Sequence, residues 1–406
     1  MPYQLNAYRQ RPLDANQGYK PLDFFGHVLT GSLTADARLL SINRYHPEHG
    51  YITLTATPPF DESKRYDSDA VRGYRAQLAI QEGIGLVVRD ALHQREAFLL
   101  EDAIPHFRFS WESGATADVY TFTPPDYPDC VIQLWSCSQP LEFLSLNLEC
   151  SLQRCAYTQL TEGGPMSPPS SQTSLKQLNT NMLYLQNPAL QATVTLQGVG
   201  VSWQPSLDGD VLMCSAAEMF ALIWHFPPVG SASRKMPAFT IDELWAQLDR
   251  ELASWRDFWK GCTLPEVAPL QLPVRRAVTY AHLCAIPVNK EATCVLTDHQ
   301  LLPLSWNRDA YYVVRALLSV QKSAIDLIHA HLIWMFEVAK RPNGYWERAY
   351  LANGIGKDPA FQLDQQLYPL LELADYIEAT GDTSLLSRFS AQIASILDLL
   401  FAREQD

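Results

Sequence analysis

The spacing of hydrophobic residues changes along the chain, from strand-like alternation in the N-terminal part to helical spacing in the C-terminal part. Between about residues 29 and 226, β-branched and aromatic residues occur in short alternating runs, such as GYITLTATPPF, CVIQLWSC and ATVTLQGVGVSW. Clusters of Gly, Pro, Asp and Ser separate these runs, and this pattern is typical of an antiparallel β-sandwich. We therefore predict a β-sandwich domain over residues 1–235. Within it, the segment TEGGPMSPPSSQTS (residues 161–174) has few apolar residues, which predicts a long exposed loop.

A single long helix is predicted to follow the sandwich. Thr240 and Glu243 have the spacing of a capping box, in which each side chain accepts a hydrogen bond from the other residue's backbone. The apolar residues that follow form one helical stripe, which includes Trp245, Trp255 and Trp259. Tryptophans on one face can form a carbohydrate platform, but so wide a stripe favours a helix packed between domains. We assign this linker helix to residues 236–264 and expect no chemistry from it.

Beyond Pro265 the apolar period is that of helices. It predicts five of them, over residues 270–285, 308–321, 323–340, 363–380 and 383–402. Gly381 is placed to end the fourth helix, and Asp382 with Thr383 is placed to cap the fifth. We therefore expect a helical domain over residues 265–406.

The first candidate site lies in SWNRDAYYVVRALL, residues 305–318. Arg308 and Asp309 stand at the start of a predicted helix, where a carboxylate is favoured by the unpaired backbone N–H groups. Arg donates a fixed fork of hydrogen bonds and Asp accepts from hydroxyls. Trp306 and Tyr311 add aromatic surface, and the set suits recognition of a sugar. A surface ion pair beside a buried aromatic cluster is the alternative interpretation.

A second segment, GYWERAYLANGIGKDPAFQLDQQLYPLLELADYIEATGD (residues 344–382), strengthens the first interpretation. Asp364 again opens an amphipathic helix, after a loop rich in Gly, Asn and aromatic residues. Short connections make consecutive helices antiparallel, so the helices that begin near Arg308 and Asp364 should point the same way. Their N-termini would then place Arg308, Asp309 and Asp364 around one mouth.

These segments resemble glycoside hydrolase family 15, the bacterial and archaeal glucoamylases and their relatives. The resemblance covers residues 272–382, and its motifs are "RD" within SWNRDAYY and "QLD" within FQLDQQLY. It implies an (α/α)6 barrel, of which residues 265–406 would supply about the first five helices. It also implies that Trp306, Arg308, Asp309, Tyr311, Trp346 and Asp364 bind substrate.

The expected activity is inverting hydrolysis of α-glucosidic bonds from the non-reducing end of an α-glucan. Such hydrolysis needs two carboxyl groups, a general acid and a general base. The resemblance places both on later segments, so we expect neither in this chain. Glu347 is the one Glu near the predicted mouth and is a weak candidate acid. An ion pair with Arg348 or Arg341 is its alternative role. A missing C-terminal barrel segment would then be a partner of this chain.

Other functions stay open at this stage. One alternative is a related six-hairpin glycosidase: a debranching α-1,6-glucosidase, a trehalase or a glycosyl phosphorylase. Another is a carbohydrate-binding remnant that keeps Arg308 and Asp309 but has lost hydrolysis. The sequence does not choose among glucan, dextran and trehalose as substrate.

Composition narrows the remaining possibilities. The 406 residues carry a net charge of −13, which argues against binding nucleic acid. No secretory signal and no membrane helix is visible, so we expect a cytoplasmic protein that does not interact with membranes. The eight cysteines lack a CxxC pair and are interpreted as reduced thiols. His46, Glu48 and His49 share a turn, but a solvated loop is favoured over a metal site. We expect no metal and no cofactor.

Overall fold

The computed structural model describes residues 10–13, 22–26, 28–56, 62–64, 66–78, 82–142, 144–154, 173–206, 212–231, 236–299, 303–320 and 324–404. Most of the loop predicted over residues 161–174 falls outside these ranges. The chain folds into two compact units. The described residues of the first lie within Met1–Arg44, Ile52–Arg154 and Pro168–Phe258, and those of the second lie within Tyr45–Tyr51 and Trp259–Asp406. The domain limits drawn at residues 235 and 264 stay predictions.

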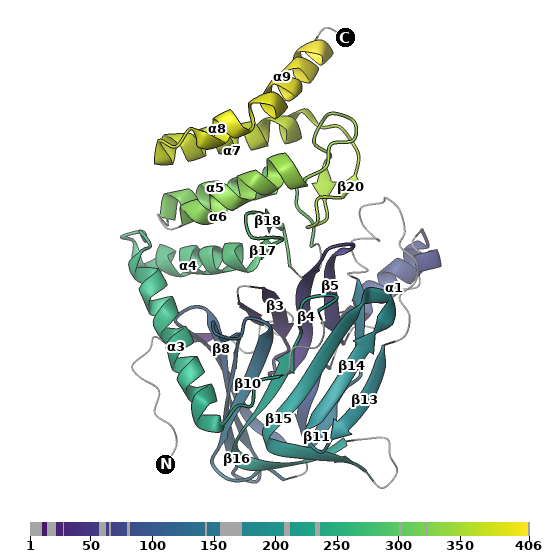
Figure 1. The fold of residues 1–406 in the computed structure, drawn as a ribbon. Helices are drawn as coiled ribbons and strands as arrows, with labels where there is room; N and C mark the ends of the chain where they lie inside the picture. Colours follow the sequence, from purple (N-terminus) through teal and green to yellow (C-terminus); the bar gives the residue numbers. More distant parts are fainter. Residues whose placement is uncertain are drawn as a thin grey trace. The chain divides into compact units, whose positions relative to one another are not determined.

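The first unit is built mainly from two antiparallel sheets (Figure 1). The larger follows the order β1-β7-β8-β9-β10-β16-β15-β14-β13, with β11 pairing both β16 and β6. Within the described residues it has eleven strands: β1 Gln10–Leu13, β6 Gly85–Val88, β7 Leu92–Leu100, β8 Ile104–Trp111, β9 Thr116–Phe122, β10 Cys130–Cys137, β11 Leu144–Asn147, β13 Ser174–Asn179, β14 Met182–Asn187, β15 Ala192–Pro205 and β16 Leu212–His225.

The smaller sheet has the order β12-β5-β4-β3-β2. Its described strands are β2 Leu22–Phe25, β3 Leu29–Leu33, β4 Leu39–His46, β5 Gly50–Thr55 and β12 Ser151–Arg154. Both sheets contribute side chains to one hydrophobic core, including Ile42 from the smaller and Trp224 from the larger. Gln133 is buried there, but its amide donates to the Ala37 carbonyl at 2.7 Å and accepts from the Trp224 indole at 3.3 Å. Its polar atoms are therefore satisfied, as burial requires.

The short helical segments of this unit were not predicted. They are α1 Ser68–Leu78, η1 Glu62–Lys64 and η2 Pro188–Leu190. Most of the described residues of α1 are exposed, so this helix has little of the apolar stripe that marks a helix in the sequence. Apart from these segments, the regular elements described between β3 and β16 are strands, as the alternating pattern predicted.

Helix α3, Ile241–Lys260, begins at the predicted capping box. The Thr240 backbone N–H donates to Glu243 Oε2 at 2.7 Å, and the Glu243 N–H donates to Thr240 Oγ1 at 3.3 Å. Trp245 packs edge-on against Tyr120 of β9 with ring centroids 5.4 Å apart. Trp255 packs in the same way against Phe25 of β2 at 5.3 Å. These tryptophans are buried, so their faces are core surface.

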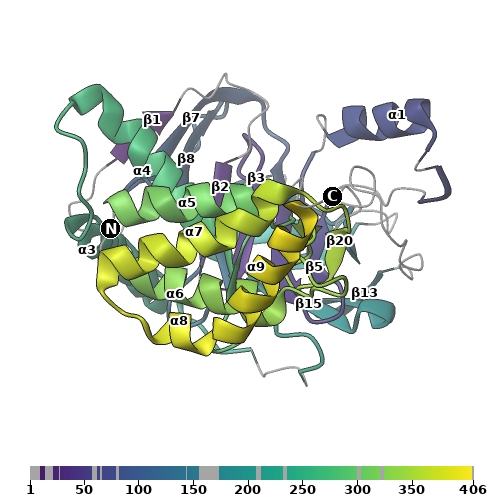
Figure 2. The same cartoon turned by 90° about the horizontal axis from the view of Figure 1, so that it is seen from above.

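The second unit is mainly helical, and Figure 2 shows its helices from above. Its regular elements are α4 Ala268–Leu283, β17 Ala285–Pro287, β18 Thr293–Val295, α5 Asn307–Val320, α6 Ile325–Ile333, a π-helical turn Trp334–Val338, β19 Ala349–Tyr350, β20 Gly356–Asp358, α7 Leu363–Thr380, α8 Ser384–Arg388 and α9 Ser390–Glu404. α7 has the predicted bounds, and the described part of α5 matches its prediction to within a residue at its start.

One predicted helix is divided. The helix expected over residues 383–402 is α8 and α9, which are separated at Phe389. Phe389 is fully buried and stacks on Phe336 with ring centroids 4.4 Å apart. The apolar period continues through this break, so periodicity alone could not reveal it.

Three chemical features of the fold bear on function. The seven cysteines that the structure describes are thiols outside disulfides. Among the described helices, none is long and apolar enough to cross a membrane. In the same part of the chain, no three His, Cys, Asp or Glu side chains are grouped so that they could hold a metal ion. In the His46–His49 turn, the His46 ring instead accepts from the backbone N–H groups of Glu48 and His49.

Candidate functional site

Helices α5 and α7 lie side by side and run parallel (Figure 2). Two ion pairs join them in matching order along both helices. Arg308 pairs with Asp364 at their starts, and Arg315 pairs with Asp375 further along. The common direction predicted from the short connections is therefore correct, and both N-termini open on one side.

Arg308 and Asp364 meet at this shared end. Arg308 Nη1 lies 3.4 Å from Asp364 Oδ2, and the two side chains keep 49% and 42% of their surface exposed. An ion pair this exposed contributes only about 0–1 kcal/mol. Asp309 lies in the first turn of α5 and is partly exposed. Each of the three predicted charged groups thus has surface accessible to a ligand.

A buried amide pair beneath the charges fixes the two helix starts to each other. Asn307 Nδ2 donates to the Gln365 carbonyl at 3.0 Å, and the Arg308 backbone N–H donates to Gln365 Oε1 at 3.3 Å. Both amides are almost fully buried. These two bonds join the start of α5 to the start of α7 beside Arg308, while Asn307 Oδ1 and Gln365 Nε2 are buried without a partner among the described residues. The sequence analysis did not select Asn307 or Gln365, although they are adjacent in the chain to its candidates Arg308 and Asp364.

The next residue, Gln366, ties α7 to the loop that carries Trp346. Its Oε1 accepts from the Trp346 backbone N–H at 2.8 Å, and its Nε2 donates to the Trp346 carbonyl at 2.7 Å. The Trp346 indole is fully buried and donates to the Met335 carbonyl at 2.9 Å. Trp346 therefore anchors the loop to the core, and in this structure its ring has no face open to a ligand.

Tyr350 connects the same loop to the segment before α5. Its backbone exchanges two hydrogen bonds with Ser305, each 2.9 Å long. Its hydroxyl accepts from the Glu347 backbone N–H at 2.6 Å and donates to the Lys340 carbonyl at 3.0 Å. These bonds hold Trp306, which is partly exposed between Ser305 and α5, on a fixed backbone.

Glu347 is buried, and its carboxylate lies against the backbone of Gly356 in β20. Burial raises the pKa of the Glu347 carboxyl, and the nearby Asp358 carboxylate raises it further. A raised pKa is a property of general acids. Arg348 forms an ion pair with Asp358, and Arg341 lies over the Trp346 ring, 4.9 Å from its centroid.

Tyr311 lies deeper between the helices than the charged groups do. It is buried, its ring packs against Tyr368 with centroids 5.1 Å apart, and its hydroxyl donates to Asp375 Oδ2 at 3.1 Å. The hydroxyl thus points toward the second ion pair of the two helices, away from Asp364. The packing explains why an aromatic residue is needed here whatever its role in binding.

A second titratable pair, which the sequence interpretation did not select, lies in the core of this unit. His331 of α6 and Glu372 of α7 are fully buried, with His331 Nε2 3.8 Å from Glu372 Oε2. Burial lowers the pKa of His331 to about 4 and raises the pKa of Glu372 well above its ordinary value. Burial thus favours the neutral form of each group, and we assign the pair to the core of the fold.

Comparisons with solved structures find proteins of similar fold. No model of a known protein family and no curated protein matches the sequence. A bacterial glucoamylase solved in complex with acarbose is similar in structure, with a TM-score of 0.56 and 12% identity over 96% of this chain and 59% of that one. A putative kojibiose phosphorylase from the human microbiome gives a TM-score of 0.53 and 9% identity over 98% and 60%. This chain thus spans about three-fifths of each neighbour, and its mixed β and α fold is glucoamylase-like.

Proposed function

We propose that this chain holds the non-reducing end of an α-glucoside at the paired starts of α5 and α7, as part of a glycoside-hydrolysing protein of the glucoamylase type. One observation carries the proposal. Two helices far apart in sequence bring Arg308, Asp309 and Asp364 to one end, where the charged groups are exposed on a buried hydrogen-bonded base. The resemblance to glycoside hydrolase family 15 and the glucoamylase-like fold support it.

The chemistry of the three groups suits a sugar hydroxyl array. Arg308 has further guanidinium donors beyond the one N–H that reaches Asp364, and each carboxylate has several acceptor positions. A sugar that bridges the groups would replace a weak surface ion pair with shorter charge-assisted bonds. Trp306, partly exposed next to them, would supply the aromatic surface that packs against the C–H face of the ring.

The proposed role is positioning and not proton transfer. Hydrolysis needs a general acid and a general base, and the resemblance assigns both to other segments. Without them we expect residues 1–406 to bind glucose or maltose weakly and to release negligible glucose. Glu347 is proposed to hold its loop against Gly356. If the chain does hydrolyse glucosides, Glu347 is the first acid to test, because burial already raises its pKa.

The experiment is a binding titration with acarbose and maltose, followed by nuclear magnetic resonance. Arg308→Ala, Asp309→Ala and Asp364→Ala should each weaken binding by roughly ten- to a hundredfold, since a hydrogen bond to a charged group contributes about 1.5–3 kcal/mol. Arg388→Ala is the matched control, because it breaks a partly exposed ion pair of the same unit, with Glu337, that involves none of the candidate residues. Equal binding by all four variants would refute the proposed site.

A phosphorylase is the second candidate, because the kojibiose phosphorylase matches nearly the whole chain in structure. The two reactions differ in the acceptor, which is water in a hydrolase and inorganic phosphate in a phosphorylase. Maltose, isomaltose, trehalose and kojibiose should therefore be offered with and without phosphate. Sugar phosphate formed only when phosphate is present would replace the hydrolase proposal. Robust glucose release that Asp309→Ala abolishes would show that the acid and base lie within residues 1–406.

A further inference from the structure

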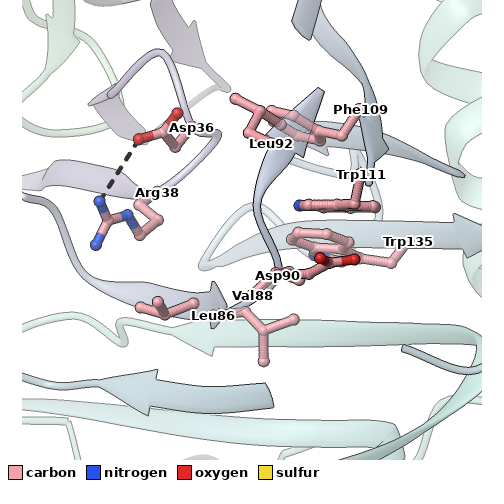
Figure 3. A pocket seen from close by; sticks show the side chains of 10 residues that line it. Asp36, Arg38, Leu86, Val88, Asp90, Leu92, Phe109, Trp111 and Trp135 are labelled. Carbon is pink, nitrogen blue, oxygen red and sulfur yellow. Dashed lines mark ion pairs between the residues drawn. The ribbon is translucent and has the colours of Figure 1, made fainter. Parts of the chain in front are cut away.

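Two kinds of contact hold arginine side chains of this chain in place. Arg38, which Figure 3 shows beside Asp36 in the first unit, forms an ion pair with that carboxylate at 3.6 Å. Arg403, in the last turn of α9, instead lies over aromatic rings. Its guanidinium carbon is 3.9 Å from the ring centroid of Phe361 and 5.6 Å from that of Tyr345. A cation within about 6 Å of a ring centroid is attracted by the negative face of the ring, so these two rings hold Arg403.

The packed side of α9 carries Arg403 to these rings. Ile396, Leu399 and Arg403 follow one another at intervals of three and four residues, so they lie on one side of the helix. Ile396 is fully buried. Leu399 lies against the loop at Gly344, where an added Cβ would be 3.5 Å from Leu399 Cδ1. Arg403 comes one turn later, so α9 contacts this loop first with an apolar side chain and then with a cation.

The two rings under Arg403 belong to different stretches of the chain before α7. Tyr345 directly precedes Trp346, whereas Phe361 lies just before the first residue of α7. The rings pack edge-on with centroids 5.2 Å apart, and the Tyr345 hydroxyl donates to the Pro359 carbonyl at 3.1 Å. Because Arg403 lies over both rings, one side chain of α9 joins the stretch before Trp346 to the stretch before α7.

Both stretches lead to the start of α7, where the sugar site is proposed. Trp346, next to Tyr345, is bonded through its backbone to Gln366 in the first turn of α7. Phe361 precedes Asp364 by three residues, a length of chain that spans at most about 11 Å. A change in the position of either ring is therefore passed to the start of α7 over a short length of chain.

We propose that Arg403 is a positioning residue for the sugar site at the starts of α5 and α7, an inference that rests on the proposed function of that site. Arg403 acts without touching the sugar. It holds Phe361 and Tyr345 in one arrangement, so that the stretches leading to Asp364 and Trp346 are ordered before a ligand binds. Without the guanidinium, part of the ligand's interaction energy is lost to ordering these side chains.

The experiment is a titration of the full chain with maltose. Arg403→Met keeps an unbranched apolar stem but removes the cation, and it should weaken binding about threefold to tenfold. Arg403→Lys keeps a cation that can lie over the rings, so it should lose less affinity than Arg403→Met. Phe361→Leu should add little to the loss in the Arg403→Met background, because the two residues act through one contact. Asp398→Ala is the matched control, because it removes an exposed charge from the same helix away from its packed side.

A measurement without ligand uses Trp306 as the reporter. Tyr350, on the same loop as Tyr345, is bonded through its backbone to Ser305, next to Trp306. In the chain labelled with 5-fluorotryptophan, Trp306→Phe identifies the fluorine signal of Trp306. This signal should shift in Arg403→Met, return toward its wild-type position in Arg403→Lys, and stay unchanged in the Asp398→Ala control.

Two results would overturn the proposal. One is a Trp306 signal in Arg403→Met that is identical to that of the wild type, whether or not sugar binds. The other is wild-type affinity of Arg403→Met for maltose when Arg308→Ala binds weakly, a result that leaves the proposed function intact. A wild type that does not bind maltose would refute the proposed function instead, and the Trp306 signal would then decide the role of Arg403. Since Arg403 is exposed, its variants are expected to fold, and an unchanged thermal transition confirms that.

Discussion

Replacing Glu251 by Gln should stabilise the sheet-rich unit at neutral and alkaline pH and leave it unchanged in acid. Glu251 lies on the buried face of α3, and its Oε1 accepts from the Trp255 indole at 2.8 Å. Burial raises the pKa of Glu251 to about 7 from 4.5, and the Trp255 bond opposes this only in part. Gln keeps the acceptor for the indole and removes the titrating proton. The change therefore isolates the cost of burying the charge.

The direction and size of this change in the free energy of unfolding follow from the coupling between protonation and folding. A carboxyl whose folded pKa is raised contributes stability that is fully present below about pH 4.5 and is lost as the pH rises through 7. Each tenfold difference in proton affinity is worth about 1.4 kcal/mol, so a pKa difference of 7 minus 4.5 corresponds to about 3 kcal/mol. We expect the variant to gain up to this amount above pH 7.

The assay is thermal or urea unfolding at several pH values between 4 and 9, for the wild type and for Glu251→Gln. The difference between them should be near zero at pH 4, grow through pH 7 and then stay constant. Glu112→Gln is the control, since it removes an exposed carboxylate from the same unit. A constant difference at every pH would refute the reasoning, because it would show that Glu251 titrates alike in the folded and unfolded chain.

Two further predictions concern the helical unit. Gly356→Ala should destabilise it, because a Cβ there would overlap Glu347 Oε2 and the buried Glu347 side chain would have to move. Adding Glu347→Ala should restore much of the loss, and additive effects in a double-mutant unfolding cycle would contradict the contact. Glu372→Gln should stabilise the unit at neutral and higher pH but not below pH 4.5, because burial raises the pKa of Glu372. The variant should still lose stability below pH 6.5, because His331, whose pKa is lowered to about 4, must remain neutral in the fold. If the variant kept its full stability as the pH fell from 6.5 to 4, His331 would not be held neutral in the fold.

Periodicity and end signals were enough to predict the strand-rich and helical regions. Thr240 and Glu243 form the capping box that their spacing predicts, and Gly381 ends α7 in the left-handed conformation. Both are local signals, which depend only on residues within a turn of one another. α1 was missed because it has little of the apolar stripe that marks a helix in a sequence. The break at Phe389 was missed because the apolar period continues through it, while Phe389 stacks on Phe336 in the fold.

The candidate site was predicted in part. Short connections between antiparallel helices were enough to bring Arg308 and Asp364 together. The sequence could not say which polar residues are buried, so Asn307, Gln365 and Gln366 were overlooked. It also could not separate the partly exposed Trp306 from Trp346, whose ring is fully enclosed. A tryptophan beside charged residues gives the same pattern in both cases, and only the packing distinguishes them.

The pattern of burial at the starts of α5 and α7 has a physical consequence for binding. Arg308 and Asp364 are joined by one exposed contact of 3.4 Å, which a ligand can replace at little cost. The groups that set their positions are different ones, namely the buried amides of Asn307 and Gln365. The exposed side chains that a ligand would contact are thus held by buried hydrogen bonds that the ligand does not disturb. A ligand then need not order the site when it binds, so less of its interaction energy is lost to ordering. A site of this construction should bind weakly but with a fixed orientation.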